Sequence, residues 1–483
     1  MKRPHVVIIG GGFGGLTAAQ ALAKAPVTVT LVDRRNHHLF QPLLYQVATA
    51  ALNPGDIAYP IRAALAKQRN VRVLLATAES IDVAARRVHL DDGMLEYDYL
   101  IIATGATHSY FGKDWASVAP GLKSIEDALE IRRRIFLAYE AAEREGDPAA
   151  QRDWLTFAVV GGGPTGVELA GALGEIGLHT LAHDFRTIDP TQVRVLLFEV
   201  GDRVLAAYPP KLSEAARRSL ERRHVEVRVG TRVTSIDDRG VTVMAAAGDA
   251  EERVGARTVL WAAGVAASPL GAQLGVPRDR AGRVEVSPDL SIPGHPEVFV
   301  VGDLARMISD GVQVPGVAQG AIQGGRHVAK IIAGEVAKSA NGAKSANGAK
   351  GAAARPAFRY RDKGNMATIG RASAVVATKR FAKHGLLAWL LWWAVHIMFL
   401  VGYRNRVSVM LQWAWSWLTF KRGARLITGP VGALPPVRAI GPDGQPAMPE
   451  GARIVSIEPA EPAPEPEPAP PADARISTSA PPD

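Results

Sequence analysis

Cysteine is absent from the 483 residues of the chain. Without thiols the chain forms no disulfide, no thiolate-ligated zinc or iron–sulfur site, and no cysteine nucleophile. The sequence therefore excludes disulfide-exchange enzymes and thiol-dependent reductases, and no other residue cluster predicts a metal site. The chemistry of this protein must come from other side chains or from a bound organic cofactor.

Acidic residues are fewer than basic ones, with 47 Asp and Glu against 56 Lys and Arg, which gives a net charge of +9. Such an excess is typical of proteins that bind nucleic acid or an anionic membrane surface. The basic residues are scattered, and no zinc-finger or RNA-recognition signature accompanies them, so we expect no nucleic-acid partner. No signal peptide precedes the first apolar run, so we expect the globular part in the cytosol.

The first fifteen residues predict a strand, a glycine turn and the start of a helix. Gly10, Gly12 and Gly15 follow the apolar run 5–9 with the G-x-G-x-x-G spacing. The first glycine allows a tight turn, the second leaves room for a pyrophosphate, and the third lets helix and strand pack closely. The next strand ends at Asp33, whose carboxylate can accept from a ribose hydroxyl. The pattern predicts a dinucleotide site, with an ordinary β-α-β turn as the alternative.

A second strand, glycine turn and helix occur in the middle of the chain. Gly161, Gly163 and Gly166 repeat the spacing, and the strand that follows ends in Glu199. Two such fingerprints, each with an acidic partner, are far more specific than one. An acid at this place disfavours a 2′-phosphate and favours NADH over NADPH, although the nearby Arg203 tempers that preference.

Glu168, just after the second fingerprint, has two interpretations. It stands three residues after Thr165, the spacing of a capping box that starts a helix. Alternatively, its carboxylate faces the reacting rings at the nucleotide end of this helix. The two roles are compatible, and the sequence does not choose between them.

Three later strands end in small or acidic residues, where a backbone can approach a bound dinucleotide. These endings are Thr104-Gly105 after 97–103, Gly264 after 258–261, and Gly302-Asp303 after 298–301.

The segment 37–48 has no clean periodicity, and we expect a loop along the ligand crevice. Within it, Tyr45 and Gln46 could line that crevice; the alternative is that Leu43, Leu44 and Tyr45 are simply core residues. A helix that begins near Pro315 carries Gln319 and Gln323 four residues apart, on one helix face. Two amides there suit a neutral polar ligand, with plain surface glutamines as the alternative.

The C-terminal third of the chain is rich in large apolar side chains. Six of the nine tryptophans lie between Trp389 and Trp417, within the apolar segments 386–401 and 407–420. Tryptophan prefers the lipid–water interface, and basic residues flank both segments on every side. We therefore favour helices lying in the membrane interface over a spanning hairpin, with a buried oligomer interface as a third option.

Two dinucleotide sites without thiols or metal ligands indicate electron transfer between a permanently bound flavin and an exchangeable nicotinamide. At this point the chain resembles the type II NADH:quinone oxidoreductases (alternative NADH dehydrogenases) of the two-dinucleotide-binding-domain flavoproteins. The resemblance extends from about Val6 to Leu426 and rests on these motifs: VVIIGGGFGG, FQPLLYQVAT, IIATG, VVGGGPTGVELAGAL, VFVVGDLA, VAQGAIQGG and GYRNRVSVMLQWAWSWLTFKRGARL.

The resemblance implies a role for each matching residue. FAD would be held by the first fingerprint and by distant segments that return to it, namely Gly10, Gly12, Gly14, Gly15, Asp33, Thr104, Gly105, Gly302, Asp303 and Ala318. NADH would be held by Gly161, Gly163, Gly166, Glu199 and Gly264. Glu168 would lie near the nicotinamide and flavin, and Gln319, Gln323 and Lys379 would line a quinone tunnel that opens at the membrane.

The expected fold is α/β, with two Rossmann-like domains, the NADH domain inserted in a discontinuous FAD domain, and a C-terminal membrane-associated helical region. A long helix at 124–145, with Ser124 and Asp127 in capping-box spacing, leads out of the first domain. The expected parts are an FAD domain at 1–118 and 269–336, an NADH domain at 119–268, a SANGAK-repeat linker at 337–355, a membrane-anchoring region at 356–429 and a disordered tail at 430–483.

The expected activity is hydride transfer from NADH to FAD and transfer of two electrons to a membrane quinone, without proton pumping. The enzyme would be peripheral on the cytoplasmic face of the inner membrane, attached through its C-terminal helices, and a homodimer is the default assembly. The alternative function is a redox-sensing flavoprotein that binds NADH without quinone turnover.

Overall fold

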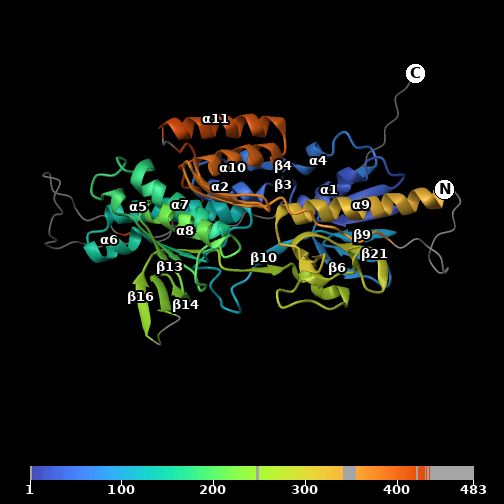
Figure 1. Cartoon of the computed structure of the whole chain (residues 1–483), viewed down its shortest axis with the longest axis horizontal. Helices are drawn as coiled ribbons and strands as arrows, with labels where there is room; N and C mark the ends of the chain where they lie inside the picture. Colours follow the sequence, from blue (N-terminus) through green and yellow to red (C-terminus); the bar gives the residue numbers. More distant parts are fainter. Residues whose placement is uncertain are drawn as a thin grey trace, which may run out of the picture. The chain divides into compact units, whose positions relative to one another are not determined.

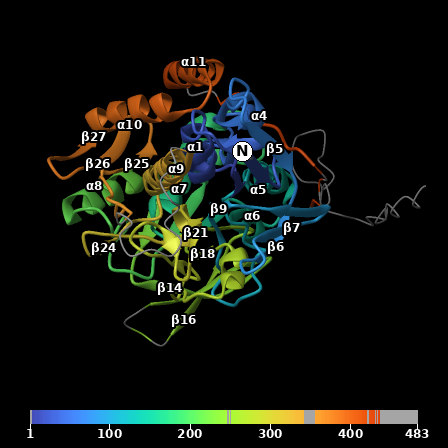
Figure 2. The ribbon, with the colours of Figure 1, turned by 90° about the vertical axis from the view of Figure 1, so that its right-hand side faces the viewer.

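The computed structural model describes residues 3–340 except 246, 247 and 249, together with 355–419, 422–429, 431, 434 and 435. All of them belong to one compact unit, Met1–Val437 (Figures 1 and 2). Most of the expected linker, at 341–354, and nearly all of the expected tail lie outside the described residues.

The N-terminal sheet is completed by a strand from much later in the chain. In spatial order its strands are β20 (Ser291–Ile292), β21 (His295–Val300), β9 (Tyr99–Ile102), β1 (His5–Ile9), β2 (Thr28–Asp33) and β5 (Val71–Leu75). Strand β21 pairs in parallel with β9, Val298 lying opposite Leu100. The chain therefore leaves this sheet after β9 and returns to it, as expected of a discontinuous domain.

The intervening chain builds a second, fully parallel sheet in the order β13 (Val225–Arg228), β12 (Arg194–Phe198), β11 (Thr156–Val160) and β17 (Thr258–Trp261). The chain also forms two three-stranded antiparallel sheets, one within each of the two dinucleotide-binding units that the parallel sheets define. The first contains β6 (Ala78–Asp82), β7 (Arg87–Leu90) and β8 (Gly93–Glu96), and the second contains β14 (Thr231–Asp237), β15 (Gly240–Ala245) and β16 (Glu251–Gly255). The two crossings between the units, β10 (Ala106–His108) and β18 (Val265–Ala267), pair with each other.

The central strands are apolar without alternation because helices cover both faces of a parallel sheet. Val6, Val7 and Ile8 are completely buried in the first sheet. Helix α1 (Phe13–Ala21) packs against α9 (Ala318–Ala340), and a Cβ on Gly325 would meet the carbonyl oxygen of Gly14 at 2.3 Å. Glycine at this crossing is what allows the two helices to approach so closely.

The predicted capping box of helix α5 (Ile125–Arg144) is confirmed. The Ser124 side chain accepts from the Asp127 backbone N–H at 3.2 Å, and the Asp127 carboxylate accepts from the Ser124 N–H at 2.9 Å. The other helices of the two units are α2 (Leu44–Ala48), α3 (Pro54–Ile57), α4 (Ile61–Ala64), α6 (Pro148–Trp154), α7 (Pro164–Glu175) and α8 (Pro210–Glu221). Short strands are β19 (Val284–Glu285), β22 (Ala305–Arg306), β23 (Ile308–Ser309) and β24 (Val312–Gln313).

The prediction of a loop at 37–48 is wrong. This segment forms β3 (His37–Leu39), a 3-10 turn (Gln41–Leu43) and helix α2. Strand β3 is stabilised by pairing with β4 (Ala58–Pro60), a non-local contact that leaves no periodicity in the segment itself. Helix α9 begins at Ala318 rather than near Pro315, because the Val317 N–H bonds to the Pro315 carbonyl in a tight turn.

The C-terminal region is a three-stranded antiparallel sheet followed by two helices. These are β25 (Asn365–Gly370), β26 (Ser373–Ala377), β27 (Ala382–Gly385), α10 (Leu386–Phe399) and α11 (Tyr403–Thr419). Both views place α10 and α11 on the side away from β14 and β16 (Figures 1 and 2). Among the described residues, no helix combines the length and apolarity needed to cross a membrane.

Candidate active site

The first glycine loop has the geometry that its spacing predicts. Gly10 has φ +99°, and a Cβ there would meet the Ala103 carbonyl oxygen at 2.5 Å. A Cβ on Gly15 would lie 1.8 Å from the Gly10 oxygen, so the start of α1 needs a glycine at this crossing. A Cβ on Gly12 would meet no atom within 4 Å, which leaves open space beside the helix N-terminus. An anion there can bind the uncapped N–H groups of the first turn.

The second loop repeats this geometry. Gly161 has φ +109°, and a Cβ there would meet the Ala262 carbonyl carbon at 2.6 Å. A Cβ on Gly166 would lie 1.8 Å from the Gly161 oxygen, while one on Gly163 would again meet nothing within 4 Å. The chain thus contains two matched cradles, each at the N-terminus of a helix whose first residues lack a side-chain cap.

Each cradle has its acidic residue at its edge. The Asp33 carboxylate accepts from the Gly11 N–H at 2.6 Å, and the Glu199 carboxylate accepts from the Gly162 N–H at 2.6 Å. A carboxylate at the carboxyl end of the second strand, beside the glycine turn, is in the position that binds a ribose hydroxyl.

Residues from distant segments converge on the first cradle and fit a flavin dinucleotide. The Thr104 hydroxyl is buried and has no hydrogen-bond partner within the described part of the chain. A Cβ on Gly14 would come within 3.0 Å of the Val301 side chain, so Gly302 and Asp303 follow directly beside this loop. Gly105 and Gly302 both have positive φ. Ala318 is the first residue of α9, and a Cβ on Gly14 would lie 3.5 Å from the carbonyl oxygen of Ala321 in the same helix. An unpartnered buried hydroxyl and an open cradle are what a bound cofactor would complete.

Gly264, a proposed residue of the second nucleotide site, lies between β17 and β18. A Cβ there would meet the Phe111 ring at 2.8 Å and the Ser109 oxygen at 3.0 Å. Close backbone packing therefore demands glycine at this position whether or not a ligand is bound.

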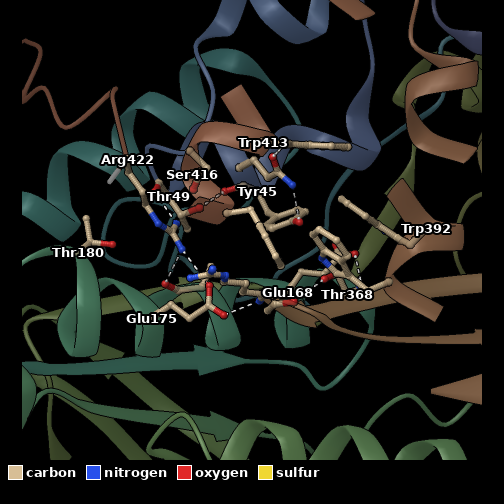
Figure 3. Close-up of a pocket in the computed structure, with 17 residues that line it drawn as sticks. Tyr45, Thr49, Glu168, Glu175, Thr180, Thr368, Trp392, Trp413, Ser416 and Arg422 are labelled. Atoms are coloured by element: carbon tan, nitrogen blue, oxygen red, sulfur yellow. Dashed lines mark hydrogen bonds and ion pairs between the residues drawn. The ribbon is translucent and has the colours of Figure 1, made fainter. Parts of the chain in front are cut away.

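Glu168 lies in α7 on the wall of a cavity of about 110 Å³ (Figure 3). Helices α2, α7, α10 and α11 line it, together with strand β25 and the turn that follows this strand. The lining residues are Tyr45, Gln46, Thr49, Ala51, Glu168, Ala172, Glu175, Thr180, Thr368, Gly370, Arg371, Trp389, Trp392, Trp413, Ser416, Trp417 and Arg422.

Burial raises the pKa of the Glu168 carboxyl to about 8, and the Thr368 N–H, at 3.4 Å, opposes this shift weakly. Glu168 therefore carries a proton at neutral pH. The capping-box interpretation is wrong, because Gly163 is the N-cap of α7 and Glu168 lies a full turn inside the helix. The second interpretation, in which the Glu168 carboxylate faces the reacting rings, stays a prediction.

Tyr45 and Gln46 combine the two roles that the sequence left open. Leu43 and Leu44 are core residues, while Tyr45 and Gln46 are buried and also line the cavity. Their side chains form a chain of hydrogen bonds to α11: the Trp413 Nε1–H donates to Gln46 Oε1 at 2.6 Å, and Gln46 Nε2 donates to the Tyr45 hydroxyl at 2.8 Å.

Arg422, just after α11, joins the C-terminal region to both cradle-bearing units. Its guanidinium donates to the Thr49 carbonyl at 2.8 Å and contacts the Glu175 carboxylate at 3.3 Å. Glu175 also receives Arg223 at 3.0 Å and the Arg371 N–H at 2.6 Å. Burial lowers the pKa of Arg422, and the Glu175 carboxylate opposes that shift.

The three residues expected to line a quinone tunnel lie outside the cavity lining. Both ends of the Gln323 amide bond to the Arg361 backbone, at 2.9 and 3.0 Å. Gln319 is half-buried one turn earlier on α9, and Lys379 is exposed between β26 and β27.

Sequence reasoning missed Glu175, Thr368, Arg371 and Arg422 as cavity residues. In the sequence, Arg422 stands out only as one of the basic residues that flank the apolar segment 407–420. The tryptophan cluster was the available signal, because Trp389, Trp392, Trp413 and Trp417 all line the cavity.

Comparisons with known proteins place these features in context. Residues 4–325 match the family described as pyridine nucleotide-disulphide oxidoreductase. The chain is 47% identical over 436 residues to the type II NADH:quinone oxidoreductase Ndh of Mycobacterium tuberculosis, which covers 88% of this chain and 91% of that protein. It is 48% identical to NdhA of the same organism, with 88% and 90% covered. The structure of NDH2 from Plasmodium falciparum in complex with NADH has a TM-score of 0.76 at 18% identity, covering 89% of this chain and 100% of that one.

Proposed function

The chain belongs to the type II NADH:quinone oxidoreductases, within the pyridine nucleotide-disulphide oxidoreductase family, and from this membership we propose a role for each part of its site. It is an FAD-dependent oxidoreductase that passes electrons from NADH to quinone. The absence of cysteine separates it from family members that use a redox-active disulfide. The observation that carries the proposal is the pair of matched glycine cradles, each with its own acid.

The first cradle binds FAD and the second binds NADH. Residues 1–118 and 269–336 form the FAD domain, and residues 119–268 form the NADH domain. The return of β21 to the N-terminal sheet supports this division, because it brings Asp303 back beside the first glycine loop. Asp33 orients the ribose of one nucleotide and Glu199 that of the other.

FAD held by the first cradle would supply the chemistry that links NADH to quinone, namely hydride acceptance and two-electron donation. The protein contributes alignment, since holding two reactants at near-contact distance removes most of the entropy cost of their encounter. Glu168 holds a proton at its carboxyl at neutral pH and faces the cavity, where the product quinol needs protons. Aromatic rings of α10 and α11 limit the access of water to this wall.

We place the quinone head group in the cavity beside Glu168. Gln319, Gln323 and Lys379 lie outside this cavity and remain proposed contacts with the rest of the quinone. Of these, Gln323 is the weakest because its amide already bonds to the Arg361 backbone. The four tryptophan rings of the lining suit a neutral ring, and the polar side chains between them can orient its carbonyl oxygens.

The surface of α10 and α11 supports peripheral attachment to a membrane. Large apolar side chains are exposed along both helices: Leu386, Leu387, Leu390, Met398, Leu411, Trp415, Trp417 and Leu418. Exposed bases stand beside them at Lys379, Arg380, Lys383, Arg404 and Arg406. This combination matches a helix pair that lies in the interface of an anionic bilayer. Attachment at the cytoplasmic face, a homodimer and the absence of proton pumping are further parts of the proposal.

A steady-state assay of the purified holoenzyme with NADH and NADPH, each with a short-chain benzoquinone and a short-chain naphthoquinone, tests this function. We expect NADH-dependent quinone reduction, with NADPH the poorer donor. Rapid reduction of the bound flavin that no quinone reverses would instead support the redox-sensing alternative. Enzyme in sealed vesicles tests the absence of pumping, since a pH gradient formed by this protein alone would contradict it.

A further inference from the structure

The hydroxyl group of Tyr45 lies at the cavity wall at the end of the hydrogen-bond chain that begins at Trp413 (Figure 3). We propose that Tyr45 donates a hydrogen bond to a carbonyl oxygen of the quinone, and that Gln46 and Trp413 are positioning residues that direct this O–H into the cavity. The inference rests on the proposed function, because it assigns an occupant to the same cavity.

The direction of each hydrogen bond follows from what each group can donate or accept. An indole Nε1–H only donates, so Gln46 must present its oxygen to Trp413. The amide nitrogen of Gln46 then faces Tyr45, and an amide nitrogen also only donates. The Tyr45 oxygen is therefore an acceptor in this bond, and its own proton is left for another acceptor.

Within the described part of the chain, no other hydrogen bond uses the Tyr45 hydroxyl proton. The Thr49 hydroxyl donates to the Tyr45 backbone carbonyl at 2.9 Å and so does not compete for the phenol. Across the cavity, Glu168 retains its own proton near pH 7, which makes it a weak competitor as an acceptor. A buried phenol with an unused donor at a cavity wall requires a partner that enters the cavity.

The backbone that carries Tyr45 is held firmly. Arg132, from α5, donates to the Val47 carbonyl at 2.6 and 2.8 Å and to the Leu52 carbonyl at 2.8 Å. Arg422 donates to the Thr49 carbonyl from the other side. Two buried guanidinium groups thus fix α2, so the direction of the Tyr45 O–H depends mainly on Gln46.

A fixed donor at a quinone oxygen assists the reaction because that oxygen gains electron density as it becomes a hydroxyl. Donors aimed at developing negative charge each contribute on the order of 10²-fold or more to kcat in other enzymes. Tyrosine is a neutral donor here, so we expect a loss of about 10- to 100-fold in kcat/KM for quinone when its hydroxyl is removed.

The decisive variants are Tyr45→Phe and Trp413→Phe, with Tyr403→Phe as the matched control at the exposed start of α11. Tyr45→Phe removes the donor. Trp413→Phe keeps an aromatic ring beside Trp392 but lets the Gln46 amide turn over, so that its oxygen captures the Tyr45 proton. Both variants should lose quinone reduction, whereas the control should not.

The measurements separate a positioning role from a merely structural one. We expect unchanged FAD content and unchanged rates of flavin reduction by NADH in stopped flow, and slower reoxidation by quinone. The double variant should lose no more than Tyr45→Phe alone, because both changes remove the same donor. If Trp413→Phe affects folding, Gln46→Leu replaces it in the same double-mutant cycle.

Quinone kcat/KM within twofold of wild type in Tyr45→Phe would overturn the inference, as would fully additive losses in the double variant. A wild-type enzyme whose NADH-reduced flavin is not reoxidised by any quinone would overturn the proposed function itself, and that result does not depend on Tyr45.

Discussion

Glu168 shows how burial determines the chemistry of a single side chain. Nothing in its sequence context distinguishes the acidity of Glu168 from that of other glutamates, yet burial at the cavity wall raises the pKa of its carboxyl to about 8. The unfolded chain would release this proton near the ordinary value of 4.5. At pH values between 4.5 and about 8, the folded protein binds more protons than the unfolded one. Its free energy of unfolding must therefore fall as the pH rises through this range.

We predict that Glu168→Gln removes this pH dependence. Relative to the variant, the wild-type holoenzyme should lose about 2–4 kcal/mol of unfolding free energy between pH 5 and pH 9, allowing for the partial exposure of the group. Urea denaturation at pH 5, 7 and 9 measures the difference. Exposed Glu79→Gln serves as the control and should follow the wild type. A constant gap between wild type and Glu168→Gln across this range would contradict the shift.

Arg422 and Arg425 form a natural pair for testing what a buried ion pair contributes. Arg422 is 9% exposed and bonds to Glu175 and to the Thr49 carbonyl, whereas Arg425 pairs with Asp184 at the surface. We predict that Arg422→Met costs about 2–4 kcal/mol of unfolding free energy, because it removes the side-chain donor of the buried Thr49 carbonyl and one cation from the Glu175 carboxylate. Arg425→Met should cost less than about 1 kcal/mol. Thermal unfolding of the two variants compares them directly, and equal costs would contradict the assigned role of Arg422.

The sequence allowed individual residues of the site to be predicted, but not the residues that surround them. Glu168 was recognisable because it lies on the second fingerprint helix. Its neighbours Tyr45, Thr368 and Trp392 come from α2, β25 and α10, and no local pattern connects those segments.

Helix α11 uses its two faces for different purposes. Val409 and Trp413 are buried against the rest of the protein, while Leu411, Trp415 and Leu418 are 62–69% exposed. An apolar exposed stripe on a helix flanked by bases is what an interfacial membrane helix requires.

We predict that replacing Leu411, Trp415 and Leu418 together by serine weakens binding to anionic vesicles at least tenfold, because each buried apolar side chain contributes about 1.5–3 kcal/mol. Cosedimentation with phosphatidylglycerol-containing vesicles gives the affinity. The control is Val312→Ser, which alters an exposed apolar residue in β24. Activity with a water-soluble quinone should be retained. Undiminished vesicle binding would refute the assignment of this face.

Elements built from local pattern could be predicted, and elements built from distant contacts could not. The buried strands β1 and β17 lie at their predicted residues because each is a short apolar run with clear boundaries. Helix α10 begins at Leu386 as expected and ends at Phe399, two residues early, where Leu400 turns to extended backbone. The segment 37–48 was missed because β3 depends on β4, twenty residues away.

On the scale of the whole molecule, the two cradles allow a paired experiment. A Cβ at Gly12 or Gly163 would meet no protein atom within 4 Å, so we expect the protein itself to tolerate a small side chain there. A pyrophosphate in the cradle would not, because the side chain would occupy its space.

We predict that Gly12→Val abolishes FAD binding, seen as loss of the flavin absorbance after purification. Gly163→Val should keep its FAD and its melting temperature but lose at least tenfold in kcat/KM for NADH. The two variants thus control for each other. A Gly163→Val protein purified without flavin would mean that the cradles are assigned the wrong way round.

The repeated fingerprint made the two-unit architecture predictable, whereas the cavity was not. Each glycine loop is encoded within some fifteen consecutive residues, so its physics is visible in the sequence. The cavity draws on residues from Tyr45 to Arg422, and its existence depends on how four helices and a sheet turn come together. Gln323, a proposed quinone contact, shows where prediction from sequence stops. Helix periodicity gives the face on which its amide lies, but not its hydrogen bonds to the Arg361 backbone.

The late arrival of β21 has a consequence for biosynthesis. A ribosome that has just released β9 must add all of the chain up to His295 before the N-terminal sheet can gain its next parallel strand. At 5–20 residues per second this delay is on the order of ten seconds or more. The contiguous sheet of β11, β12, β13 and β17 can form during that interval, so the nascent chain should acquire a folded nucleotide unit before it can retain its flavin. Flavin insertion would then report that synthesis has passed α9, and a truncated chain would remain colourless.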